Sequence, residues 1–179
     1  YTQQLAKKYG HQLIIDNAQS YYSERIKGIA TIYSPRKFFG VPDGGIAYVD
    51  NPIKKNFKQD NSYDRCRHLL RRYDELASEG YSDFRENDDK LDNSQILLMS
   101  ELTKAILRNI NYEDVAKIRM KNFITLHSFF SNYNQISIAV EDIKCPLVYP
   151  YLTNTGKELN QRLNANKVSV GTCSTSIDD

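Results

Sequence analysis

The amino-acid sequence predicts an α/β fold with a mainly parallel sheet flanked by helices. Three short apolar runs lie near the amino end, and turn-forming residues bound each of them, which is typical of buried strands. After residue 55 the apolar residues recur at helical spacing instead. A chain of 179 residues buries about 70% of its unfolded surface, so we expect a domain with a true hydrophobic core.

The predicted strands span residues 13–15, 29–34 and 45–49. The first strand ends at Asp16, and the second is rich in β-branched residues, which favour strands. A short helix over residues 3–9, closed by Gly10, precedes them. Residues 35–45 join the second and third strands, and their two prolines and three glycines predict an irregular loop.

Helices dominate the rest of the chain. They are predicted over residues 62–78, from a Ser94 cap to about Arg108, from Asn111 or Tyr112 onward, and over residues 155–165. The polar stretch 80–93 predicts a loop. Short strands are predicted at residues 147–149 and 168–170. A domain boundary near residues 134–146 would separate a larger domain from a smaller αβ domain.

Composition excludes several classes of function. A net charge of +2 gives no support to nucleic-acid or membrane-surface binding. No apolar run approaches the roughly 20 residues that cross a bilayer, and the opening segment does not resemble a signal peptide. The three cysteines and three histidines are widely spaced, so neither a disulfide framework nor a metal site is expected. These features favour a reducing cytoplasm.

Asp16 is the first candidate site residue. In open α/β sheets, ligands bind at the carboxyl ends of the strands, which is where Asp16 stands. A buried carboxylate costs free energy unless it is paired, and a protonated pyridine nitrogen would be a suitable partner. The alternative is an aspartate that caps a turn with Asn17, and position alone leaves both readings open.

Lys37 follows the second predicted strand in the irregular loop. A lysine amine forms a Schiff base only when it is neutral part of the time, and burial or a nearby cation such as Arg36 favours that form. Most lysines are exposed, so this loop taken alone favours a solvated lysine. Ser34 could donate to a phosphate oxygen, and Gly44-Gly45 would let the backbone approach a ligand.

The combination of these elements resembles a known family. The segments LIIDNAQS (13–20) and IYSPRKFFGVPDGGIAYVDN (32–51) are similar to the DegT/DnrJ/EryC1/StrS aminotransferases, fold-type I enzymes that use pyridoxal 5'-phosphate (PLP). The matching residues are Asp16, Ala18, Gln19 and Ser20, then Ser34, Lys37, Asp43, Gly44 and Gly45. Residues 99–123 look like the segment that leads out of the family's large domain, so the resemblance covers nearly the whole chain.

The resemblance implies a role for four residues. Asp16 would pair with the pyridine nitrogen and keep it protonated, Gln19 would bond near the ring hydroxyl, and Ser34 would bind the phosphate. Lys37 would be the catalytic residue, which forms the internal aldimine and then moves a proton between substrate and cofactor. The amino group would pass from glutamate or glutamine to a keto sugar, for cell-surface polysaccharide or related amino-sugar synthesis.

The resemblance also implies how the chain fits into the family's architecture. In the family a phosphate-binding loop and a ring-stacking aromatic precede the Asp strand, so we expect an incomplete chain from a homodimeric enzyme. Residues 1–134 would be the carboxyl-terminal part of the PLP-binding large domain, and residues 135–179 a partial small domain. The alternative is a truncated, inactive remnant with at most an interaction or structural role.

A run of arginines marks the first helix after the predicted strands. Its members are Arg65, Arg67, Arg71 and Arg72. Exposed charge runs usually form a solvated helix face, and that reading is favoured. Contact with a nucleotide diphosphate or with a partner subunit is the alternative.

Overall fold

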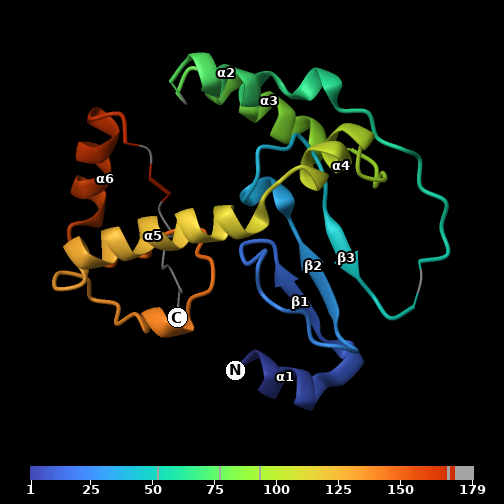
Figure 1. The fold of residues 1–179 in the computed structure, drawn as a ribbon, viewed down its shortest axis with the longest axis horizontal. Coiled ribbons are helices and arrows are strands. Elements are labelled where there is room, and N and C mark those ends of the chain that lie inside the picture. Colours follow the sequence, from blue (N-terminus) through green and yellow to red (C-terminus); the bar gives the residue numbers. More distant parts are fainter. Residues whose placement is uncertain (52, 77, 93, 169, 172–179) are drawn as a thin grey trace.

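The computed structural model describes residues 1–51, 53–76, 78–92, 94–168 and 170–171, which form an α/β fold (Figure 1). These residues contain six α-helices and one three-stranded mixed sheet. In chain order the elements are α1 (Thr2–Tyr9), β1 (Ile14–Asn17), β2 (Ala30–Tyr33), β3 (Ile46–Tyr48), α2 (Arg67–Asp74), α3 (Tyr81–Asp92), α4 (Glu101–Arg108), α5 (Tyr112–Phe130) and α6 (Gly156–Ala165). Single 3-10 turns occur at Gly10–Gln12, Pro35–Lys37, Tyr63–Arg65 and Val140–Asp142.

The sheet confirms the three predicted strands and corrects their direction. The strand order is β1-β2-β3, with β1 and β2 parallel and β2 and β3 antiparallel. Asp16 pairs in register with Ile32, and Tyr33 with Ile46. The loop between β2 and β3 reverses the chain without the crossover helix that usually joins parallel strands, so β3 returns antiparallel.

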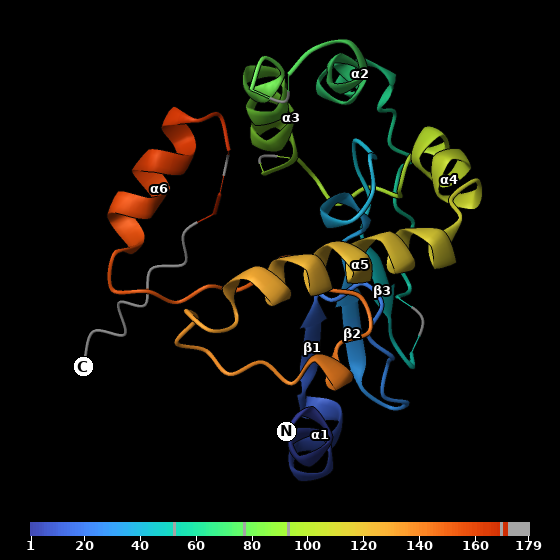
Figure 2. The same cartoon turned by 60° about the vertical axis from the view of Figure 1, so that its left-hand side comes forward.

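The helices lie at the two ends of the sheet, in contrast to the expected flanking arrangement. In both views α5 crosses the end at which β1 and β2 stop, and α1 lies at the opposite end (Figures 1 and 2). One sheet face carries Ile14 and Ile32, which are exposed. On the other face Thr31 and Tyr33 are buried, and the Tyr33 ring packs against Tyr21. The described helices therefore leave one face of the sheet open.

The hydrophobic core is centred on the loop that follows β2. Phe38, Phe39 and Val41 of this loop form a buried cluster with Leu107 of α4. Partly buried side chains surround it: Tyr21, Tyr22, Met99, Ile106, Ile110, Tyr112, Val115, Cys145 and Leu147. The segment that sequence analysis predicts as irregular thus supplies three of the four residues of this buried cluster.

Helix α3 occupies residues predicted to be a loop. On its exposed side, residues one helical turn apart form ion pairs, Lys90 with Glu86 and Arg85 with Asp89. Such pairs stabilise a helix without an apolar stripe. Only Asn87 is buried among its residues, so no hydrophobic period marks this helix in the sequence.

The boundaries of other elements follow tertiary contacts. The cap of α4 is Ser100, not Ser94, because Leu98 pairs with the backbone of Lys58 and Asp60 and keeps the intervening segment extended. Helix α5 starts at Tyr112, as predicted, with Asn111 as its cap, and α6 matches its predicted range to within one residue. The basic helix is shorter than expected, a 3-10 turn and then α2.

Two further predictions concern the carboxyl-terminal part. Residues 147–149 do not form the predicted strand; Leu147 packs against the core and the Tyr149 ring contacts Phe123. The predicted strand at 168–170 includes residue 169, which lies outside the described residues. The expected domain boundary stays a prediction. No described helix combines the length and apolar character needed to cross a membrane.

We expect His68, whose ring lies between helices α2 and α3, to make the free energy of unfolding depend on pH. It is buried on α2 with its ring 5.7 Å from that of Phe84 on α3, and burial, helped by Arg72 and Arg36, lowers the pKa of His68 below 6.5. As the pH falls through about 6.5, the unfolded chain takes up a proton that the folded chain does not, so the free energy of unfolding falls.

We therefore expect the urea midpoint to drop between about pH 7.5 and pH 5.5, and to drop less in His68→Leu. His11→Leu is the control, since His11 is exposed. Equal drops in wild type and His68→Leu would contradict the assignment.

Candidate functional site

Asp16 and Ser34 lie at the carboxyl ends of the neighbouring strands β1 and β2 and on the same face of the sheet. Asp16 pairs with Ile32 in the parallel ladder, so both side chains point to one face. Ser34 is two residues beyond Ile32, and its backbone is still extended, with φ −116° and ψ 104°. Because side chains alternate along an extended chain, Ser34 shares the face of Asp16.

Asp16 adopts the turn-capping arrangement. Its side chain is exposed, and Oδ1 accepts a hydrogen bond from the Ala18 N–H across 2.9 Å. A solvated carboxylate carries no cost of burial, so the argument that Asp16 requires a cationic partner does not apply to this arrangement. Pairing of Asp16 with a pyridine nitrogen stays a prediction.

Lys37 and Gln19 are both accessible from solvent. Lys37 ends the 3-10 turn after β2, its N–H donates to the Ser34 carbonyl oxygen across 3.4 Å, and its side chain is exposed. Gln19 is exposed on the turn after β1, and Ser34 is half-buried. The sheet edge therefore presents a carboxylate, an amide, a hydroxyl and an amine from two neighbouring strands.

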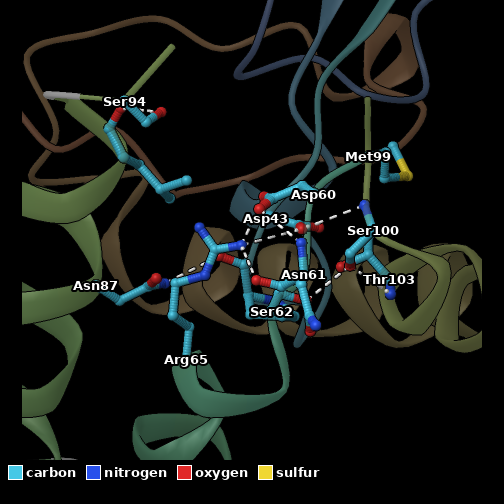
Figure 3. Close-up of polar contacts among 12 residues, drawn as sticks. Asp43, Asp60, Asn61, Ser62, Arg65, Asn87, Ser94, Met99, Ser100 and Thr103 are labelled. Atoms are coloured by element: carbon cyan, nitrogen blue, oxygen red, sulfur yellow. Dashed lines mark hydrogen bonds and ion pairs between the residues drawn. The ribbon is translucent and has the colours of Figure 1, made fainter. Parts of the chain in front are cut away.

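A buried ionic network includes Asp43, which belongs to the same loop between β2 and β3 as Lys37 (Figure 3). Asp43, 1% exposed, accepts from the Ser100 N–H at 3.3 Å and from Arg65 at 3.5 Å. Arg65 also donates to Asp60 across 2.6 Å, and the Ser62 and Ser100 hydroxyls are 2.7 Å apart. Burial opposes ionisation of Asp60, but hydrogen bonds from Arg65 and from a backbone N–H outweigh it and lower the pKa of Asp60.

This network changes the interpretation of two sequence features. Asp43, a matching residue of the family resemblance, is buried in an ion cluster. Gly44 has a φ of +105°, a backbone conformation that L side chains rarely adopt, and an added Cβ would also lie 3.2 Å from Met99 Cγ and 3.3 Å from Thr103 Cγ2, so the local backbone inside the protein favours this glycine.

The arginine run does not form one solvated face. Arg65 is buried against two carboxylates, and Arg71 donates to Glu75 and Asp83. Arg67 has a side chain 74% exposed, at 3.4 Å from Asp83. A solvated position, the reading favoured from the sequence, therefore holds for Arg67 and for the exposed Arg72, but not for Arg65, whose ion pairs lie inside the protein.

A cleft that the sequence did not indicate lies beside Gln19. Its volume is about 580 Å³, within the range of small-molecule sites. The turn at residues 19–24 forms one wall and residues 138–150 form the other, and Lys144 Nζ contacts Glu24 Oε1 across 2.8 Å between them. Burial raises the pKa of the Cys145 thiol in this lining. The two walls are far apart in the sequence and share no motif that would reveal the cleft.

The described residues contain no group of three or more histidine, cysteine or acidic side chains able to hold a metal ion. Comparisons of the chain with models of protein families, with curated proteins and with solved structures found no match. The fold and the sheet edge thus define an α/β protein with an accessible set of polar groups at the ends of two parallel strands.

Proposed function

We propose that the chain is a PLP-dependent aminotransferase that moves an amino group from glutamate or glutamine to a nucleotide-linked keto sugar. The supporting observation is the in-register parallel pairing of β1 and β2, with Asp16 and Ser34 on one face and Lys37 in the next turn. A cytoplasmic homodimer that serves cell-surface polysaccharide or amino-sugar synthesis belongs to the same proposal.

The chemistry of the donor groups fits PLP. The cofactor offers a pyridine nitrogen, a ring hydroxyl, a phosphate and an aldehyde, and when bound it supplies an electron sink. Asp16 would keep the pyridine nitrogen protonated, Gln19 would bond near the ring hydroxyl, and Ser34 would donate to the phosphate. Lys37 would bind the aldehyde carbon and later carry the proton at the substrate carbon.

A second candidate is a non-catalytic protein of the same family. It is favoured by the Asp16 carboxylate, which is solvated and already accepts a bond from Ala18. A solvated carboxylate attracts a protonated ring nitrogen only weakly, because water and salt screen the two charges. Such a residue would contribute little to holding the pyridine ring in its protonated form.

Titration with PLP tests the proposal. We expect a saturable visible absorption band, and after borohydride reduction the cofactor mass on the peptide that contains Lys37. Label spread over many exposed lysines without saturation would contradict the assignment. Turnover with glutamate and a nucleotide-linked keto sugar would then exclude the non-catalytic candidate.

A further inference from the structure

Helix α3 contacts the loop that carries Lys37 on both sides of that residue. The Arg36 guanidinium donates to the Asp88 carboxylate across 2.9 Å. The Asn87 amide, in a residue 3% exposed, donates to the Pro42 carbonyl oxygen across 2.9 Å. Two consecutive residues of α3 therefore restrain the loop on both sides of Lys37: Asp88 holds Arg36, and Asn87 holds the Pro42 carbonyl.

The residue that follows Lys37 is also fixed. The Phe38 ring is buried in the core, with the Arg119 guanidinium 4.8 Å from its centroid. Arg119 also donates to the Phe38 carbonyl oxygen across 3.1 Å. Lys37 thus lies between two neighbours that are held in place, Arg36 and Phe38, while its own side chain is exposed. This arrangement fixes the Lys37 backbone and leaves its amine accessible to a ligand.

The charges around Asp88 favour the same arrangement. The hydrogen bond from Arg36 lowers the pKa of Asp88 against the effect of burial, and the charges of Arg36, Arg85 and Lys37 add to it. The direct ion pairs of Asp88 are made with the two arginines, at 2.9 Å and 3.9 Å. The carboxylate is therefore occupied by arginine, and the Lys37 amine can turn to a ligand.

We propose that Asp88 and Asn87 are positioning residues that hold Lys37 at the ligand end of the sheet. This inference rests on the proposed function, since it assigns α3 to the same site. Neither residue would touch the reacting atoms: Asp88 acts through the side chain of Arg36, and Asn87 acts through the backbone carbonyl of Pro42.

Asp88→Ala tests this role against Glu86→Ala, which removes a carboxylate from the exposed side of the same helix, where it pairs with Lys90. On rapid mixing with saturating PLP, we expect the visible band to form at least about tenfold more slowly in Asp88→Ala, since a misplacement of about 1 Å can cost roughly 100-fold. The PLP concentration at half-saturation should change little. Glu86→Ala should match wild type, and Asp88→Glu should recover part of the rate.

Amide hydrogen exchange gives a readout that needs no cofactor. In Asp88→Ala and Asn87→Ala, exchange at residues 36–41 should accelerate, whereas in Glu86→Ala it should not. Unchanged exchange, or equal rates of band formation in Asp88→Ala and Glu86→Ala, would overturn the positioning role. Failure of the wild type to take up PLP, with exchange altered as expected, would instead overturn the proposed function and leave α3 as a support of the loop.

Discussion

Replacing Lys37 with alanine is expected to abolish both the visible PLP band and the covalent label after reduction, with the fold preserved. A primary amine is needed to bond the aldehyde carbon, and alanine has none. Because the Lys37 side chain is exposed, its removal opens no cavity and should change the free energy of unfolding by less than about 0.5 kcal/mol. Absorbance titration and urea denaturation measure the two effects.

Two control variants separate the amine of Lys37 from its charge. Lys37→Arg keeps the positive charge but carries a guanidinium that is always protonated, so it should also lose the band. Lys117→Ala removes an exposed lysine on α5, 3.8 Å from Asp114, and should retain the band. A band that persists in Lys37→Ala would refute the catalytic assignment.

Arg65→Ala is expected to lower the free energy of unfolding by about 3–5 kcal/mol, because it leaves buried carboxylates without their cation. The Arg65 side chain is 9% exposed, and those of Asp43 and Asp60 are 2% and 14% exposed. Because both carboxylates are largely shielded from solvent, water would replace the lost contact only in part. Urea denaturation followed by circular dichroism measures the change.

The neighbouring arginine provides the control for this prediction. Arg67 has the same side chain in the same basic stretch, but it is largely exposed, so Arg67→Ala should cost less than about 1 kcal/mol. Arg65→Lys keeps the charge with fewer donors and should fall between the two, which gives a measurable variant if Arg65→Ala does not fold. Similar losses for Arg65→Ala and Arg67→Ala would show that the network contributes little.

The strands could be predicted because their signals are local. Apolar runs bounded by turn residues located β1, β2 and β3 to within a few residues, and the apolar stripe that follows Asn111 located α5. The direction of β3 could not be predicted, because it depends on how a loop of glycines and prolines folds over the core. Helix α3 was missed because its residues carry no apolar period; its contacts are exposed ion pairs, one buried amide and the Phe84 ring against His68.

The candidate site could be predicted in part for the same reason. Strand ends place Asp16 and Ser34 at one edge, and the parallel register brings them to one face. The sequence does not reveal that Asp16 caps a turn in solvent or that Asp43 is buried with Arg65. These outcomes depend on residues tens of positions away, such as Ser100, which no local pattern links to the loop.

The aromatic pair Phe38 and Phe39 directly follows Lys37 in the chain. One short stretch thus contains both the lysine of the proposed chemistry and two aromatic side chains of the buried core. An insertion or deletion in it would displace the lysine and the core residues together. A library that varies this stretch would confound loss of turnover with loss of soluble protein. The cleft beside Gln19 is lined by residues outside that stretch, so its walls can be altered while the stretch is left untouched.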